Sequence, residues 1–117
     1  MANTFKVVTK ANVTSADVIY TVAGSTTTVL LGIMLGNTTS SAITATVSLG
    51  SDTANRAGAN NEANQTVELI TSTSIPGNSS LEILSGNKVV METTDVLKID
   101  CSVTDKVSGT LSIMEIT

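Results

Sequence analysis

Histidine and tryptophan are absent from this chain of 117 residues, and cysteine, proline, tyrosine and phenylalanine occur once each. Without histidine, the usual base that activates a serine or cysteine nucleophile is missing. One cysteine excludes both an intrachain disulfide and zinc sites of the ordinary type. Cys101 is expected to be a small buried residue on a strand rather than a reactive thiol. The sequence therefore predicts no nucleophilic centre and no bound cofactor.

Acidic side chains are the remaining candidates for metal binding or acid–base chemistry. The ten acids are spread along the chain and form no Asp-x-Asp-x-Asp loop of the kind that binds calcium. A sugar-cleaving cleft would need two carboxylates and usually has aromatic walls, yet aromatic residues make up only 2% of the sequence. We expect neither a metal site nor enzymatic activity.

The balance of charge bears on the possible partners. The formal net charge is −4, and the six basic residues are scattered. Because nucleic-acid binding needs clustered lysine and arginine, no nucleic-acid partner is expected. No run approaches the roughly 20 apolar residues of a membrane-spanning helix, and residues 1–6 lack the apolar stretch of a secretory signal. The expectation is a protein made in a cytoplasm that contacts no membrane.

What the chain does contain is apolar residues in strict alternation with small polar ones, the pattern of half-buried strands. Gly, Asn, Ser and Pro clusters separate the alternating segments, which are residues 5–13, 18–22, 26–36, 43–49, 67–70, 81–84, 89–91, 96–101 and 110–116. Eight or nine short strands at this spacing predict an all-β fold, an antiparallel β-sandwich or barrel. The length fits a single domain over residues 1–117.

Residues 26–36 form the longest apolar run. Alternation predicts two faces for this strand, with Val29, Leu31, Ile33 and Leu35 on one and Leu30, Gly32 and Met34 on the other. Apolar side chains on both faces predict a central strand that is covered twice, with a neighbouring subunit as one possible cover. Residues 43–49 alternate with Thr and Ser instead, which predicts a half-buried strand with a hydroxyl-rich outer face. A core with so few aromatic residues gains less per side chain, so tight packing or a partner's surface must supply the difference.

The loops over residues 37–41 and 50–64 and the N-terminal segment are the candidate contact surfaces, with ordinary solvated loops as the alternative. The longer loop has small residues and the only arginine, so it could become ordered on a partner. The candidate partner-contact residues are Phe5, Lys6, Asn37, Thr38, Thr39, Asp52, Asn55, Arg56, Asn60, Asn61 and Glu62.

Several segments are distinctive beyond their β composition. They are residues 20–29 and 35–44, the Pro-Gly turn and Leu strand of 74–83, the Gly-Asn-Lys and Glu-Thr-Thr-Asp turns within 86–99, and the final strand at 111–117. Together these segments resemble small virion structural proteins of tailed bacteriophages, especially phages of cyanobacteria and other marine bacteria. The resemblance implies that the protein is located in the virus particle and assembles there with other virion subunits.

Three functions are compatible with these features. The first, which best fits a small acidic chain without catalytic residues, is a capsid decoration (cement) protein. It would bind the major capsid protein on the outer head surface, with a homotrimer at local threefold positions as the favoured assembly. The second is a tail, neck, baseplate or fibre component. The third is a carbohydrate- or receptor-binding module, which the scarcity of aromatic residues disfavours.

Overall fold

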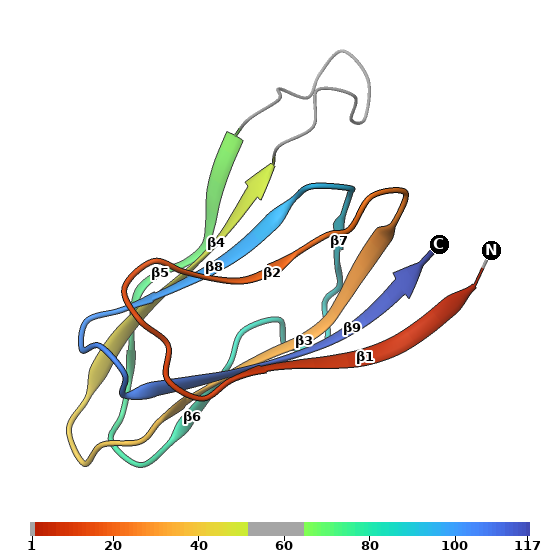
Figure 1. The fold of residues 1–117 in the computed structure, drawn as a ribbon. Coiled ribbons are helices and arrows are strands. Elements are labelled where there is room, and N and C mark those ends of the chain that lie inside the picture. Colours follow the sequence, from red (N-terminus) through yellow and green to blue (C-terminus); the bar gives the residue numbers. More distant parts are fainter. Residues whose placement is uncertain (1, 52–64) are drawn as a thin grey trace.

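The computed structural model describes residues 2–51 and 65–117, and within them all regular structure is β-strand (Figure 1). The nine strands are β1 (Asn3–Lys10), β2 (Asp17–Thr21), β3 (Thr27–Asn37), β4 (Ile43–Ser51), β5 (Gln65–Ile75), β6 (Ser80–Glu82), β7 (Val89–Met91), β8 (Val96–Cys101) and β9 (Val107–Ile116). The all-β prediction is confirmed, and each predicted segment overlaps a strand. The bounds differ most at β1, which ends at Lys10 rather than at residue 13, and at β5, which extends to Ile75 rather than ending at residue 70.

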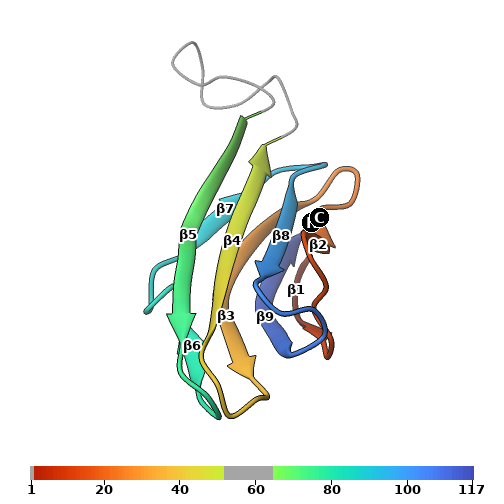
Figure 2. The same cartoon turned by 90° about the vertical axis from the view of Figure 1, so that its left-hand side faces the viewer.

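The strands form two antiparallel sheets that pack face to face. The first, called sheet A here, has the order β1-β9-β3-β6, and β7 also pairs with β3. The second, sheet B, has the order β2-β8-β4-β5. Figure 2 shows β5, β4 and β8 of sheet B in front, with β3 and β9 of sheet A behind them. Of the two predicted architectures, sandwich and barrel, the structure is therefore a sandwich.

The core between the sheets is almost entirely aliphatic. Its largest fully buried side chains are Leu30, Ile33, Leu35, Ile75, Met91, Leu97, Ile99, Leu111, Ile113, Val13, Val22 and Val47. Cys101, at the end of β8, is buried with them, and its thiol donates to the carbonyl oxygens of Val13 and Val103 at 3.4 and 3.1 Å. Burial, assisted by the nearby Asp100 carboxylate, raises the pKa of this thiol. The prediction that Cys101 is a small buried residue on a strand is confirmed.

The predicted phase of residues 26–36 is wrong before Gly32. Leu30, Ile33 and Leu35 are all fully buried, although the alternation placed Leu30 on the opposite face from the other two. The register of β3 against β9 shifts between Leu30 and Gly32, and a bulge of this kind inserts one extra residue and reverses the alternation. On the outer face of β3, Val29 is half-buried and Met34 is 49% exposed, so the described residues cover this face only in part.

Candidate interaction surface

The edge strand β1 is hydrogen-bonded on one side only. All eight of its residues pair with β9 without a register shift. Just before the strand, Ala2 and Thr117 exchange two backbone hydrogen bonds of 3.2 and 3.0 Å. Bonded and non-bonded pairs alternate along an antiparallel ladder. It follows that four residues of β1 direct their backbone N–H and C=O groups along the free edge: Asn3, Phe5, Val7 and Thr9.

The other described sheet edges are short or interrupted. β6 and β7 have three residues each, and β2 has five. The pairing of β2 with β8 shifts register between Val18 and Tyr20. β5 is long, but its pairing with β4 shifts twice, and Ser72 in it has a φ of 43°. Short strands and bulges protect edges from pairing with other chains, so β1 is the regular edge among those that the structure describes.

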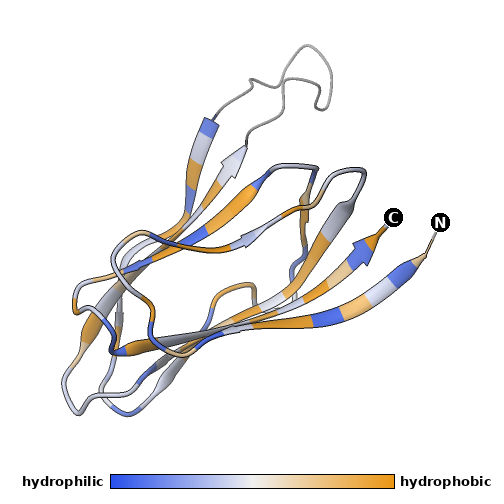
Figure 3. Ribbon diagram, viewed as in Figure 1, coloured by the Kyte–Doolittle hydropathy of each residue, from blue (hydrophilic) through white to orange (hydrophobic). Residues whose placement is uncertain are grey.

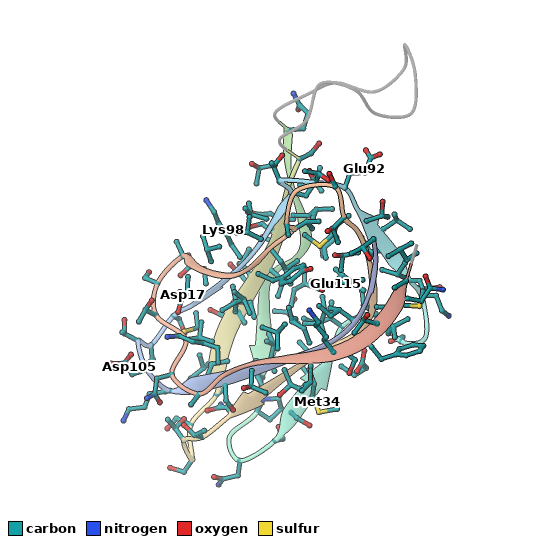
Figure 4. All side chains as sticks on the ribbon, turned by 45° about the vertical axis from the view of Figure 1, so that its right-hand side comes forward. Asp17, Met34, Glu92, Lys98, Asp105 and Glu115 are labelled. Atoms are coloured by element: carbon teal, nitrogen blue, oxygen red, sulfur yellow. The ribbon has the colours of Figure 1, made fainter. Side chains whose placement is uncertain are left out.

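Apolar side chains cross the outer face of sheet A in register. Cross-strand neighbours on β1, β9, β3 and β7 form what we call the apolar row, namely Phe5, Met114, Val29 and Val90. Phe5 is 73% and Val90 59% exposed. Val7 and Met34 add exposed apolar surface on the same face, and Figure 4 shows Met34 projecting away from the interior of the sandwich. This gathering of apolar side chains makes the outer face of sheet A a candidate interaction surface.

A polar cluster lies beneath β1, on the side of the sheet that faces the interior. Glu115 of β9 forms an ion pair with Lys6, with Oε1 and Nζ 2.7 Å apart. Its Oε2 accepts a hydrogen bond of 2.5 Å from the Tyr20 hydroxyl. Because tyrosine has a single hydroxyl proton, Thr28 must be the donor in the 2.7 Å bond between its Oγ1 and the Tyr20 oxygen. The cluster joins three strands of sheet A to β2 of sheet B.

The cluster shifts two pKa values. The hydrogen bond from Lys6, followed by that from Tyr20, lowers the pKa of Glu115. Burial, followed by the hydrogen bond to Glu115, raises the pKa of Tyr20 to about 12. Both shifts favour the charged carboxylate and the neutral phenol, which are the forms that make these bonds. The cluster therefore ties β1 to β9 and to β2.

The predicted contact residues of β1 lie on its two faces. Phe5 is on the outer face within the apolar row. Lys6 points inward to Glu115, although its side chain remains 54% exposed. Figure 3 shows hydrophobic and hydrophilic stretches interspersed along β1. Two of the sequence-selected residues therefore fall on the edge that the structure leaves open.

The predicted contact residues of the β3–β4 turn are largely engaged within the chain. Asn37 is only 4% exposed. Its Nδ2 donates to the carbonyl oxygens of Ser41 and Ile75 at 2.8 and 2.9 Å, and its Oδ1 accepts from the Thr39 backbone N–H at 2.9 Å. Thr38 is exposed, and its hydroxyl donates to the Lys106 carbonyl oxygen at 2.7 Å. In this structure Asn37 is a buried link within the turn.

A second turn packs against this one, and we call residues 37–41 and 75–79 together the turn pair. The backbone N–H of Asn78 donates to the Thr39 carbonyl oxygen at 2.7 Å. A Cβ added at Gly77 would lie 2.3 Å from the Ser40 carbonyl oxygen. Only glycine allows the two backbones to approach this closely. The remaining candidates, Asp52, Asn55, Arg56, Asn60, Asn61 and Glu62, lie outside the described residues.

A hollow on sheet B is the other feature of the described residues that bears on ligand binding. A shallow hollow of about 330 Å³ on sheet B is lined by Ser15, Thr44, Thr46, Ser72, Asp100, Cys101 and Ser102. Its carboxylate, on Asp100, already accepts hydrogen bonds from the Ser15 hydroxyl and the Ala16 N–H. Across residues 2–51 and 65–117, no three acidic or cysteine side chains are placed to hold a metal ion. In the same residues no helix has the length and apolarity needed to cross a membrane.

Comparisons with known proteins show similarity in fold only. No protein-family model matches the sequence, and no curated protein matches it. Two similar solved structures are the T13 viral particle of infectious bursal disease virus, with a TM-score of 0.53 and 12% identity, and the VP2 subviral particle of this virus, with the same two values. They align with 97% and 96% of this chain but with only 30% and 32% of the viral chains.

A third structure, a Bacillus endospore appendage described as a disulfide-linked pilus, aligns with 99% of this chain and 87% of its own, at a TM-score of 0.48 and 13% identity. The chain thus has the β-sandwich fold of a segment of viral capsid proteins and spans about a third of their length. At these identities the fold is what the comparison establishes.

Sequence reasoning selected Phe5 but missed the rest of the apolar row. The signal was present in residues 26–36, where apolar residues occupy both phases of the alternation. The sequence did not indicate which strands lie beside β3. Met114 and Val90 belong to the row because β9 and β7 pair with β3.

Proposed function

We propose that this protein is a structural component of a virus particle. The observation that carries the proposal is the apolar row on the outer face of sheet A, on a sandwich fold that is also found in capsid proteins. A row with exposed Phe5 and Val90 at its ends and half-buried Val29 and Met114 between them does not stabilise an isolated monomer, whereas a shell subunit can use such a face to adhere to its neighbours. The absence of a metal cluster among the described residues is compatible with this role.

More narrowly, the role that fits best is a decoration protein on the outer head surface of a tailed phage, with the major capsid protein as its partner. The phage assignment rests on the sequence resemblance alone. In this role the outer face of sheet A would lie on the capsid. Each copy would bury apolar area worth about 25 cal/mol per Å² before the cost of association is subtracted, and the contributions of many copies would add over the shell.

The first test is the copy number of the protein in purified particles, measured by quantitative mass spectrometry against the major capsid protein. Decoration of the head predicts a ratio near one. A ratio of a few per cent would overturn the decoration role in favour of a neck, tail, baseplate or fibre component, and absence from particles would overturn the virion role itself.

The second test addresses the surface. Val90→Asp places a charge at the end of the apolar row, and we expect it to reduce attachment to heads that lack the protein at least tenfold. The matched control is Val18→Asp, because Val18 is also an exposed valine, 49% accessible, but lies on sheet B. Equal loss in both variants, or no loss with Val90→Asp, would contradict the assignment of sheet A as the contact face.

A further inference from the structure

We propose that two copies of this chain associate through β1, with the two β1 strands antiparallel and Phe5 of one copy opposite Phe5 of the other. The proposal concerns the isolated protein and does not depend on its role in a particle.

The backbone of β1 is the first argument. Along the free edge, Asn3, Phe5 and Val7 direct unpaired N–H and C=O groups away from β9, as the alternation from the Ala2–Thr117 bonds requires. A second β1, related by a twofold axis, presents the same groups in the complementary order. Pairs of residues in an antiparallel ladder then exchange two hydrogen bonds each, which is the usual way in which an open edge takes up another strand.

The apolar row selects the register. With Phe5 opposite Phe5 of the partner subunit, the row continues across the seam from one copy into the other, and the two rings form an aromatic cross-strand pair. The register in which Phe5 faces Val7 of the partner subunit places the two Lys6 side chains directly opposite each other, and like charges in that position are destabilising. In the proposed register Lys6 faces Thr4 of the partner subunit instead.

The charges beneath the seam are complementary in this register. Thr4 is opposite Glu115 on β9, so the inner-face row runs from Glu115 through Thr4 to Lys6 of the partner subunit. Each Lys6 keeps its own Glu115 at 2.7 Å and gains the partner subunit's Glu115 on the far side of the intervening threonine. A lysine on an edge strand ordinarily discourages pairing. Here the positive charge of Lys6 is balanced by the Glu115 carboxylates of both copies.

The remaining edges favour a twofold contact over the threefold assembly expected from the sequence. A ring of three would have to pair β1 with a different edge of the next copy. β2, β6 and β7 are short, and β5 is interrupted by register shifts. A twofold contact uses the regular edge β1 twice and needs none of them.

The oligomeric state is measured by sedimentation over a range of protein concentrations, for the natural chain and for Val7→Pro. The Val7 N–H faces the free edge, so proline removes a hydrogen bond across the seam and none to β9. We expect a dimer whose dissociation constant rises about tenfold or more in the variant. Thr9→Pro is the matched control, because Thr9 has the same orientation but lies beyond the paired residues 2–8, and it should leave the dimer intact.

A cross-link checks the register and does not depend on the proline variant folding. Phe5→Cys should give a disulfide-linked dimer under mild oxidation, because residues opposite each other in a bonded pair have Cα atoms about 5.5 Å apart. Thr9→Cys should not. A natural chain that is monomeric at all concentrations, a trimer, a dimer that Val7→Pro leaves unchanged, or cross-linking at Thr9 rather than Phe5 would each overturn the proposal.

Discussion

The turn pair and the edge strand β1 both lie at the periphery of the sandwich. They differ in how many of their polar groups form hydrogen bonds within the chain. In the turn pair, the Asn37 amide and the Asn78 N–H are all bonded within the chain. Along β1, every second residue has backbone N–H and C=O groups without a partner among residues 2–51 and 65–117, and apolar side chains lie beside them. A satisfied surface stabilises the fold, whereas an unsatisfied one is available for contact. Substitutions in the first should therefore reduce stability, and substitutions in the second should reduce association.

The largest expected effect is that of Gly77→Ala. The new Cβ would lie 2.3 Å from the Ser40 carbonyl oxygen and 2.4 Å from its carbon, and both atoms belong to backbone that cannot rotate away. We expect the free energy of unfolding to fall by about 3 kcal/mol or more, measured by chemical denaturation. Gly24→Ala is the control, because nothing lies within 4 Å of the added atom there. Equal stability of the two variants would mean that the turns are not tightly packed.

Asn37→Ala should have the next largest effect. It removes the amide that bonds the Ser41 and Ile75 carbonyl oxygens and the Thr39 N–H, although the Ser41 oxygen keeps its bond from the Thr39 hydroxyl at 2.8 Å. A buried group left without a partner costs about 1–3 kcal/mol. We expect a loss of about 2–3 kcal/mol in the same denaturation assay, against no measurable change for the exposed Asn87→Ala. A decrease in the free energy of unfolding below about 0.5 kcal/mol would show that water replaces the amide and that the turn is accessible to solvent.

The polar cluster beneath β1 should make stability depend on pH at both extremes. The pKa of Tyr20 is raised to about 12, whereas in the unfolded chain it is about 10. The unfolded state therefore loses its proton first, and stability falls as pH rises from about 10 to about 12. The lowered pKa of Glu115 acts at the acidic extreme. The contribution of Glu115 to the free energy of unfolding is complete above the pKa of glutamate in the unfolded chain, and it is lost as pH falls through the lower pKa of the folded state.

The chain has one tyrosine, so its ultraviolet absorbance titration reports Tyr20 directly. Tyr20→Phe should remove the part of the alkaline loss that comes from this group and cost about 1 kcal/mol at neutral pH. Ionisation of Tyr20 near 10 in the folded protein would contradict its bond to Glu115.

The smallest effect on stability should come from the apolar row itself. Phe5→Thr changes a side chain that is 73% exposed and keeps a good strand former, so we expect the monomer to unfold within about 0.5 kcal/mol of the natural chain. The buried neighbour of the row on β7 gives the contrast: Met91→Thr should cost about 2 kcal/mol or more. Both free energies of unfolding would be measured by chemical denaturation of dilute protein. A Phe5 variant as unstable as the Met91 variant would mean that the row serves the fold rather than a partner.

The sequence was sufficient for what depends on local pattern. Strands and turns could be placed because alternation and turn residues act over a few positions, and the hydroxyl-rich outer face of β4 followed in the same way, with Thr44, Thr46 and Ser48 opposite the buried side. The bulge in β3 could not be predicted, since it arises from pairing with a strand about 80 residues away, between Leu30 and Gly32 on one side and Ile113 and Ser112 on the other.

The candidate surface was predictable in part, for the same physical reason. Asn37 in a run of small polar residues reads as an ordinary turn residue, and its burial depends on the approach of the second turn through Gly77. Phe5 and Lys6 could be selected from their segment, but their separation onto opposite faces of an open edge depends on β9 lying beside β1.

The unbroken pairing of β1 with β9 has a mechanical consequence. Eight residues are in register, with hydrogen bonds perpendicular to the strands. A load applied along β1 would stretch all these bonds at once, in shear, whereas a load across the strand would open them one after another. The Lys6–Glu115–Tyr20 chain passes part of any such load from sheet A to sheet B. A partner that pulls lengthwise on β1 would thus meet the combined resistance of both layers, and one that lifts it sideways would meet far less.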